Sequence, residues 1–204
     1  MGKFTKFVCT LLTVLLIFAF FGLMSDKRKL REEVIRLHVV GASDSAEDQA
    51  VKLQVRDGIL AALEGELMEL TDPASAKVYL QENLQIIEEI ANEILKNGGF
   101  TQRATVTLME EAFPVRHYDT FSLPSGVYHS LRVTIGEGEG KNWWCVVFPS
   151  LCLPAAGERF EDAAAGAGFS DELSSTLKEE QNYEVRFFLL DLLGKLENFF
   201  FKNR

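Results

Sequence analysis

A run without charged residues extends from Val8 to Met24 and follows two lysines, Lys3 and Lys6. A run of this length and composition is typical of the apolar region of a signal peptide or of a short membrane-spanning helix. A buried core helix would carry a polar stripe, whereas this run has few polar or small interruptions: Cys9, Thr10, Thr13 and Gly22. The segment therefore predicts export or membrane anchoring, with the body of the protein outside the cytoplasm.

The residues after this run leave its cleavage open. The nearest small-residue site, Leu23-Met24-Ser25, matches the A-x-A-like pattern poorly. Residues 26–31, DKRKLR, place positive charge after the apolar run, which opposes a simple anchor with a cytoplasmic N-terminus. The cluster is either a solvated linker or a contact with anionic lipid. We divide the chain into residues 1–31, a signal peptide or anchor plus basic linker, and residues 32–204, a single domain.

The body is acidic and carries few chemical motifs. The chain has 21 Lys and Arg against 30 Asp and Glu, a net charge of −9, which repels phosphate backbones. No HExxH, CxxC or GxSxG sequence is present. In the acidic run GEGEGK, 136–141, the glycine that should open a Walker A motif and the Ser or Thr that should close it are both missing. We expect no nucleic acid, cofactor, metal or small-molecule substrate.

Hydrophobic periodicity predicts a single α+β domain. Ser45 and Asp48 form a capping-box pattern before a helix, and Pro73 opens a second helix that ends at Asn97-Gly98-Gly99. The expected helices are 46–70 and 73–97, and the expected strands are 32–40, 104–113, 127–135, 142–148 and 183–193. Small-residue loop (155–168), a short helix (170–180) and a helical tail (195–202) complete the chain. We expect a mostly antiparallel sheet of about five strands, packed against two long helices after the N-terminal hydrophobic segment.

The cysteines suggest a disulfide. Cys9 lies inside the apolar run, which leaves Cys145 and Cys152 as a pair in the exported body. An oxidising compartment favours a bond between them. The alternative is an exported thiol-dependent hydrolase in which Cys145 is activated by a histidine, with His129, His38 and His117 as candidates.

Two further features have alternative interpretations. Along 142–148, Trp143, Cys145 and Val147 share one face of the predicted strand, and Trp144, Val146 and Phe148 share the other. The strand is either covered on both faces or presents one tryptophan to a partner. Similarly, the carboxylates of Asp44, Glu47 and Asp48 either cap the helix at 46 or form a binding patch.

Two long runs resemble the stage II sporulation protein R family. They are RLHVVGASDSAEDQAVKLQVRD, 36–57, and LPSGVYHSLRVTIGEGEGKNWWCVVFPSLC, 123–152. The resemblance implies a signalling protein rather than an enzyme. Such a protein is exported from the forespore into the space between forespore and mother cell. There it activates a membrane-embedded aspartic protease of the mother cell, which processes pro-sigma factor E.

Carried over position by position, the resemblance also implies a set of partner-binding residues. They are His38, Ser43, Asp44, Ser45, Asp48, Gln49, Arg56, Trp143, Trp144, Phe148 and Pro149.

Overall fold

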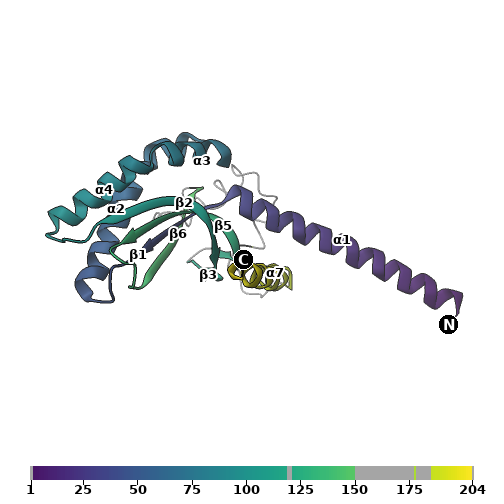
Figure 1. Cartoon of the computed structure of the whole chain (residues 1–204). Helices are drawn as coiled ribbons and strands as arrows, with labels where there is room; N and C mark the ends of the chain where they lie inside the picture. Colours follow the sequence, from purple (N-terminus) through teal and green to yellow (C-terminus); the bar gives the residue numbers. More distant parts are fainter. Residues whose placement is uncertain (1, 119–120, 150–176, 178–184, 204) are drawn as a thin grey trace.

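A four-stranded sheet forms the centre of the molecule (Figure 1). The computed structural model describes residues 2–118, 121–149, 177 and 185–203. The expectations for 155–168 and, apart from Leu177, for 170–180 lie outside these residues, as does Cys152. In spatial order the strands are β2 (Ala104–Phe113), β5 (Gly126–Ile135), β1 (Ile35–Val40) and β6 (Asn142–Phe148).

The sheet is mixed, so the expectation of a mostly antiparallel sheet with about five strands was wrong. β1 pairs with β5 in parallel, whereas β1·β6 and β2·β5 are antiparallel. The helices α2, α3 and α4 and the strands β2, β3 and β4 lie between β1 and β5 in the chain, so this parallel pair joins strands far apart in the sequence. A separate small ribbon joins β3 (Arg116–His117) to β4 (Ser122–Leu123).

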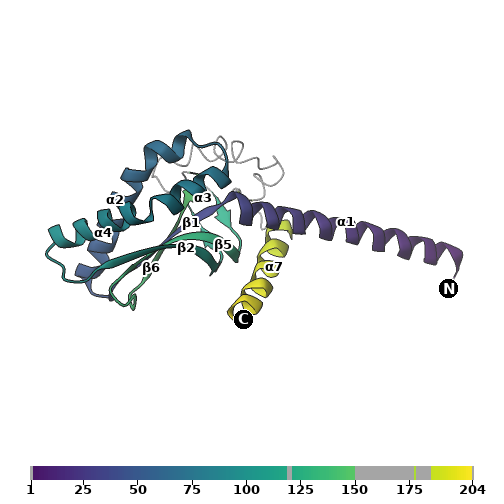
Figure 2. The ribbon, with the colours of Figure 1, turned by 45° about the horizontal axis from the view of Figure 1, so that its top comes forward.

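Three helices cover one face of the sheet (Figure 2). They are α2 (Ala46–Glu69), α3 (Pro73–Glu82) and α4 (Leu84–Asn97). Both predicted helix starts are confirmed, because Ser45 Oγ accepts a hydrogen bond from the Asp48 amide and Asp72 caps α3 in the same way. The second expected helix is divided at Asn83, the C-cap of α3 and N-cap of α4.

The main core lies between these helices and the sheet. Alternate residues of β1, namely Ile35, Leu37 and Val39, point into it. They meet apolar residues of the helices and of the neighbouring strands, including Val55, Ile59, Leu80, Ile87, Leu95, Leu131, Val133 and Val147. Each such side chain stabilises the fold by about 1.5–3 kcal/mol relative to leaving it in water.

Helix α1 (Lys3–Glu33) projects from the body (Figure 1). Among the described residues it is the one helix long and apolar enough to cross a membrane, and its apolar window is 0% buried. It continues through the basic cluster 26–31 to Glu33, so these residues are helical, and Leu30 is buried against the body. Val34 alone separates α1 from β1.

The last expected strand, 183–193, is wrong, because Val185–Lys202 forms helix α7. An apolar run cannot by itself distinguish a strand from a buried helix. Here Phe187, Leu190 and Gly194 recur at helical spacing on the face that meets the body. A side chain at Gly194 would overlap the Ser125 carbonyl group, which explains the glycine at this close approach.

A second core lies where α7 and the end of α1 meet the other face of the sheet. Its buried apolar residues are Leu30, Val34, Phe113, Phe121, Leu123, Tyr128, Val146, Leu177, Phe187 and Leu190. The Asp191 carboxylate accepts hydrogen bonds from Ser125 N (2.9 Å) and Oγ (2.6 Å) and so ties α7 to the residue before β5. Burial raises the pKa of Asp191, but hydrogen bonds from Lys195 and Ser125 lower it below the usual value overall.

Candidate functional site

The two runs identified in the sequence meet at one end of the sheet. We call this region the motif junction: residues 41–45, the first turns of α2 and the turn 136–141. Gly140 N donates to Gly41 O (2.9 Å), and Lys141 N donates to the Asp44 carboxylate (2.7 Å). Lys52 of α2 donates to Lys141 O (2.9 Å). The runs 36–57 and 123–152 therefore form one structural unit.

Hydrogen bonds between polar side chains and the backbone hold the loop before α2 in place. Ser43 Oγ donates to the Asp48 carboxylate and accepts from Ser45 N (3.1 Å), while Gln49 Nε2 donates to Ser43 O (2.7 Å). Asp48 is buried and Asp44 is exposed. Most of these polar groups are thus bonded within the chain, and the predicted helix-capping role of this region is confirmed for Ser45.

The glycines of 136–141 make a tight turn. Gly136 (φ 58°) and Gly138 (φ 68°) adopt left-handed backbone conformations that side chains disfavour. At position 140 the requirement for glycine is steric, because a Cβ there would overlap the Ser43 carbonyl group. The turn packs directly against the loop before α2.

A hollow of about 530 Å³ lies beside the motif junction. Three carboxylates, from Asp48, Glu137 and Glu139, and one guanidinium, from Arg103, contribute to its lining. The remaining lining residues are Ala42, Ser43, Gln102, Thr105 and Gly136. The charged groups in its lining are therefore mainly acidic.

The two tryptophans lie on opposite faces of edge strand β6. Trp143 is on the helix side and is 38% exposed. The guanidinium of Arg56 in α2 lies over its ring, 4.2 Å from the centroid, and is held there by an ion pair with Asp57 (2.6 Å). A cation–π contact of this kind contributes about 0.5–1 kcal/mol at an exposed site. Trp143 is thus an exposed aromatic ring supported from one side by an arginine.

Trp144 faces the other way and is half-buried. The ring of His38 stacks on it, with centroids 5.5 Å apart, and the Arg116 guanidinium lies 3.6 Å from its centroid. Burial lowers the pKa of Arg116. Trp144 therefore joins β6 to β1 and β3.

His38 is held at both ring nitrogens. Nδ1 lies 2.9 Å from Glu111 Oε1, and Nε2 lies 2.9 Å from Asn142 Oδ1. The same Glu111 oxygen accepts from Arg132 at 2.8 Å. Burial raises the pKa of Glu111, but the hydrogen bond from His38 and the charges of His38 and Arg132 outweigh it, so this pKa lies below its usual value. Glu111 and Arg132 were not predicted from the sequence.

Arg36 was also missed and is fully buried. Its NH2 nitrogen donates to Tyr118 Oη (2.7 Å), and its guanidinium lies over the rings of Phe113 (4.2 Å) and Tyr128 (5.2 Å). Among the described residues, Nε and NH1 of Arg36 have no hydrogen-bond partner. The aromatic rings supply electrostatic compensation instead. A charged residue alternating with apolar ones in RLHVV was the signal that could have indicated this position.

Phe148 and Pro149 are buried, joined by a cis peptide bond. Phe148 packs in the main core beside Val147, so the prediction that it shares a face with Trp144 was wrong. The cause is an irregularity in the β1·β6 register, where Ile35 pairs with Phe148 and Arg36 with Val146. Cys145 is also buried in the main core, and its bond to Cys152 stays a prediction, since Cys152 lies outside the described residues.

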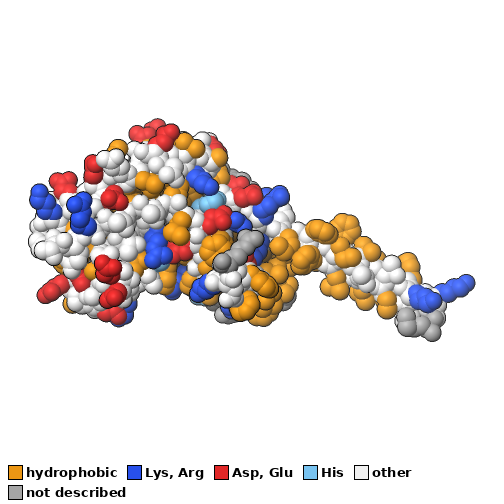
Figure 3. All heavy atoms as spheres, in the orientation of Figure 1, with side chains coloured by type: hydrophobic (Ala, Val, Ile, Leu, Met, Phe, Trp, Pro, Cys, Tyr) orange, Lys and Arg blue, Asp and Glu red, His pale blue; other side chains and the backbone are white. Residues whose placement is uncertain are grey.

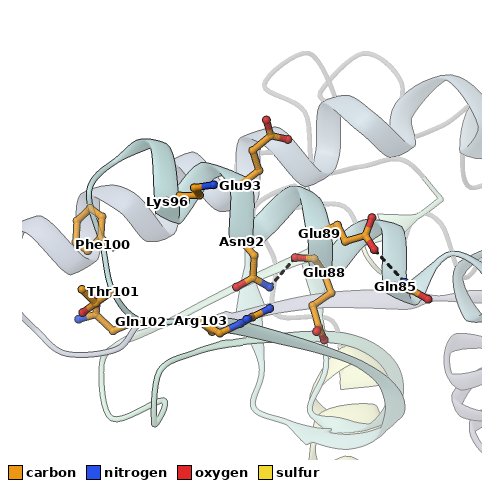
Figure 4. A pocket seen from close by; sticks show the side chains of 10 residues that line it. All are labelled: Gln85, Glu88, Glu89, Asn92, Glu93, Lys96, Phe100, Thr101, Gln102 and Arg103. Carbon is orange, nitrogen blue, oxygen red and sulfur yellow. Dashed lines mark hydrogen bonds between the residues drawn. The ribbon is translucent and has the colours of Figure 1, made fainter.

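A larger hollow of about 770 Å³, between α4 and the start of β2, lies away from these motifs (Figure 4). Two of its polar side chains, Asn92 and Glu88, bind the backbone of the edge strand β2. Asn92 exchanges two hydrogen bonds of 3.0 Å with the Ala104 backbone, and the Glu88 carboxylate accepts from Val106 N at 3.0 Å. These contacts cover backbone groups that an edge strand would otherwise present to other chains.

No group of three or more His, Cys, Asp or Glu residues within the described part of the chain could hold a metal ion.

Comparison with known proteins matches the same two runs. The sequence profile of the stage II sporulation protein R family matches residues 31–158, which is more than half of the chain. The chain belongs to the stage II sporulation protein R family. The match includes all four strands of the sheet and the motif junction. The family resemblance predicted from the sequence is therefore confirmed.

A curated relative extends the similarity beyond this range. The stage II sporulation protein R of Bacillus subtilis (strain 168) is 28% identical over 221 residues, covering 95% of this chain and 99% of the relative. No solved structure matches the chain. The stage II sporulation protein R assignment therefore rests on sequence, and the fold described above adds its three-dimensional arrangement.

Proposed function

We propose that this chain is an exported signalling protein of sporulation that activates a membrane-embedded aspartic protease in the mother cell. The protease then processes pro-sigma factor E. Membership of the stage II sporulation protein R family supports this proposal, as does the apolar helix α1 at the N-terminus. The proposed location is the space between forespore and mother cell, with the body either anchored by α1 or released by cleavage.

The observation that carries the proposal is the exposed ring of Trp143 on the edge strand β6. Its support by Arg56 places a large aromatic group and an arginine side by side on the surface. Trp and Arg are the residues most often found at the energetic centres of protein interfaces. The motif junction lies next to this pair, since Lys141 and Asn142 directly precede Trp143. We propose this surface, and not the face of Trp144, as the contact with the protease.

The geometry does not favour a thiol-dependent hydrolase. Cys145 points into the main core, whereas His38 lies on the opposite face of the sheet. His129 belongs to β5, which β1 separates from β6, and its Nε2 lies 3.4 Å from Lys77 Nζ. His117 lies in the separate β3·β4 ribbon, with Nδ1 2.7 Å from Ser122 Oγ and its ring beside Phe187 of the second core. A nucleophilic cysteine needs a base within hydrogen-bond reach, and none of the three histidines is placed for that role.

The test is genetic complementation in the sporulating organism. A strain lacking the gene should accumulate unprocessed pro-sigma factor E, and the wild-type gene should restore processing, as followed by immunoblot. Trp143→Ala should abolish or strongly delay processing while the protein still accumulates. Ile86→Ala is the matched control, because Ile86 is 55% exposed on α4 outside both runs. Normal processing in the deletion strain would contradict the proposed function, and normal processing with Trp143→Ala would contradict the proposed surface.

The thiol alternative has its own test. Mass spectrometry of the exported protein, with and without reduction, should show Cys145 bonded to Cys152 in protein that activates processing. A Cys145 thiol that is free and reacts selectively with an alkylating reagent in active protein would instead support the hydrolase.

A further inference from the structure

Helix α7 has apolar side chains on two opposite faces. Phe187 and Leu190 face the body and are buried. The opposite side carries five large apolar residues, between 43% and 67% exposed, at spacings of one helical turn: Phe188, Leu192, Leu196, Phe199 and Phe200. A helix at the surface of a soluble protein normally places polar residues on the side away from the core. The outer face of α7 therefore indicates an apolar neighbour.

Contacts with α1 fix the position of α7 along the axis of α1. Lys27 Nζ donates to the Leu193 carbonyl (3.0 Å) and pairs with Glu197 (2.9 Å). Lys27 follows the end of the charge-free run at Met24 by three positions. If α1 spans a bilayer, Lys27 lies at the headgroup level, since Lys and Arg mark the ends of spanning helices. The middle of α7 then lies at the same level.

The orientation of α7 agrees with this level. Figures 1 and 2 show α7 crossing α1 at a steep angle instead of running alongside it. A helix in this position lies roughly in the plane of a membrane that α1 crosses. In Figure 3 the hydrophobic surface of α1 continues onto the part of the body where α7 lies.

We propose that α7 is an interfacial helix, with its outer apolar face inserted at the boundary between headgroups and acyl chains of the bilayer that α1 spans. Helices of this kind bury Phe and Leu about 5–10 Å into that boundary. Basic side chains of both helices flank this face, but Lys27, Arg28, Arg31 and Lys195 pair with carboxylates of the chain. The apolar side chains of α7, more than headgroup charge, therefore carry the proposed contact. The proposal concerns lipid alone and does not depend on the protease.

The test uses the full chain in lipid nanodiscs that contain an anionic phospholipid. Phe199→Trp adds a fluorescent reporter to the outer face of α7, and Lys96→Trp adds the matched control at the exposed end of α4, far from α1 (Figure 1). The signal of each added tryptophan is obtained by subtracting the parent chain, which carries Trp143 and Trp144. We expect emission from residue 199 to shift to shorter wavelength and to be quenched by lipids brominated near the headgroup, and emission from residue 96 to show neither effect.

A second variant separates lipid contact from packing. In the wild-type chain, the amides of α7 should be more protected from hydrogen exchange in nanodiscs than in detergent. In Leu192→Asp/Phe199→Asp this added protection should disappear, while the protection of β1 and β5 stays unchanged. The proposal is overturned if the reporter at 199 remains water-exposed, or if the chain does not insert. It is equally overturned if protection of α7 requires two chains in one disc or addition of the protease, because the face would then belong to a protein partner.

Discussion

The imidazole of His38 is stacked on the indole of Trp144, with 5.5 Å between ring centroids and 24° between ring planes. His38 comes from the run 36–57 and Trp144 from the run 123–152, and both side chains lie on the side of the sheet away from α2. Their neighbour Trp143 faces the helices and the solvent. The two adjacent tryptophans therefore have different environments: Trp144 packs within the fold, and Trp143, the proposed contact residue, is exposed.

The first prediction concerns these tryptophans. Trp144→Ala should lower the free energy of unfolding by about 2–3 kcal/mol, somewhat below the value for a fully buried aromatic residue, because the ring is half-buried. Trp143→Ala should cost about 1 kcal/mol or less, mainly through loss of the Arg56 contact. Urea denaturation followed by circular dichroism measures both. Equal losses would contradict the assignment of separate roles.

The second prediction concerns the close approach in the motif junction. Gly140→Ala should destabilise the protein by at least about 1 kcal/mol, because its Cβ would overlap the Ser43 carbonyl group. Gly65→Ala is the control, since Gly65 lies in α2 with no atom within 4 Å of the added Cβ. That change should stabilise the helix by about 0.5–1 kcal/mol. The midpoint of thermal unfolding should therefore fall for Gly140→Ala and rise for Gly65→Ala. A rise for both variants would show that residue 140 has room for a side chain.

The third prediction is a pH dependence of stability from Glu111. Its folded pKa lies below the usual value, because the hydrogen bond from His38 and the charges of His38 and Arg132 outweigh burial. The unfolded chain thus binds this proton more readily than the folded protein. The contribution of Glu111 is complete above the unfolded pKa of about 4.3 and is lost as the pH falls through the folded pKa.

Glu111→Gln should accordingly reduce the loss of stability on acidification below about pH 5, and should lower stability at neutral pH by about 1–3 kcal/mol. Urea unfolding between pH 3 and 7 measures both effects. Glu93→Gln, at an exposed position of α4, provides the control. If the difference between Glu111→Gln and wild type stays constant over this range, the ion pairs of Glu111 do not set its pKa.

The fourth prediction concerns the docking of α7. Gly194→Ala places a methyl group against the Ser125 carbonyl and should release α7 from the start of β5. Amides of 186–202 should then lose hydrogen-exchange protection in detergent, whereas those of β1 should not. Lys202→Ala, at the exposed end of α7, should leave protection unchanged. Unchanged protection with Gly194→Ala would mean that α7 is held without this close approach.

Local signals predicted individual elements well. The strand 104–113 and the start of α2 were predicted at the observed residues. Both depend on local signals, namely the alternation of apolar and polar residues and the cap at Ser45. Strand 142–148 was also predicted correctly, but not the face of Phe148, since the register irregularity arises from pairing with β1. Helix α7 was misread because both of its sides are apolar, which removes the helical period from the pattern.

Pairings across long stretches of chain were beyond local patterns. The parallel β1·β5 pair follows from the path through three helices, which no single run of residues encodes. Likewise, His38 and Glu111 lie 73 residues apart in the sequence. They meet because β5 pairs with both β1 and β2 and so places these two strands in one sheet. Of the candidate site, the two runs and the Ser45 cap were predicted, whereas their meeting through Gly41, Asp44 and Lys52 and the His38–Glu111–Arg132 network were not.

Val34, the single residue between α1 and β1, has a mechanical consequence. A single residue leaves little room for bending between helix α1 and the central part of the sheet. If α1 is retained as a membrane anchor, as in the proposal above, the body keeps a fixed height and orientation above the lipid surface, and its search for the proposed partner becomes two-dimensional. Lateral diffusion and rotation about the axis of α1 would then bring the Trp143 surface to its target, in place of free tumbling in solution.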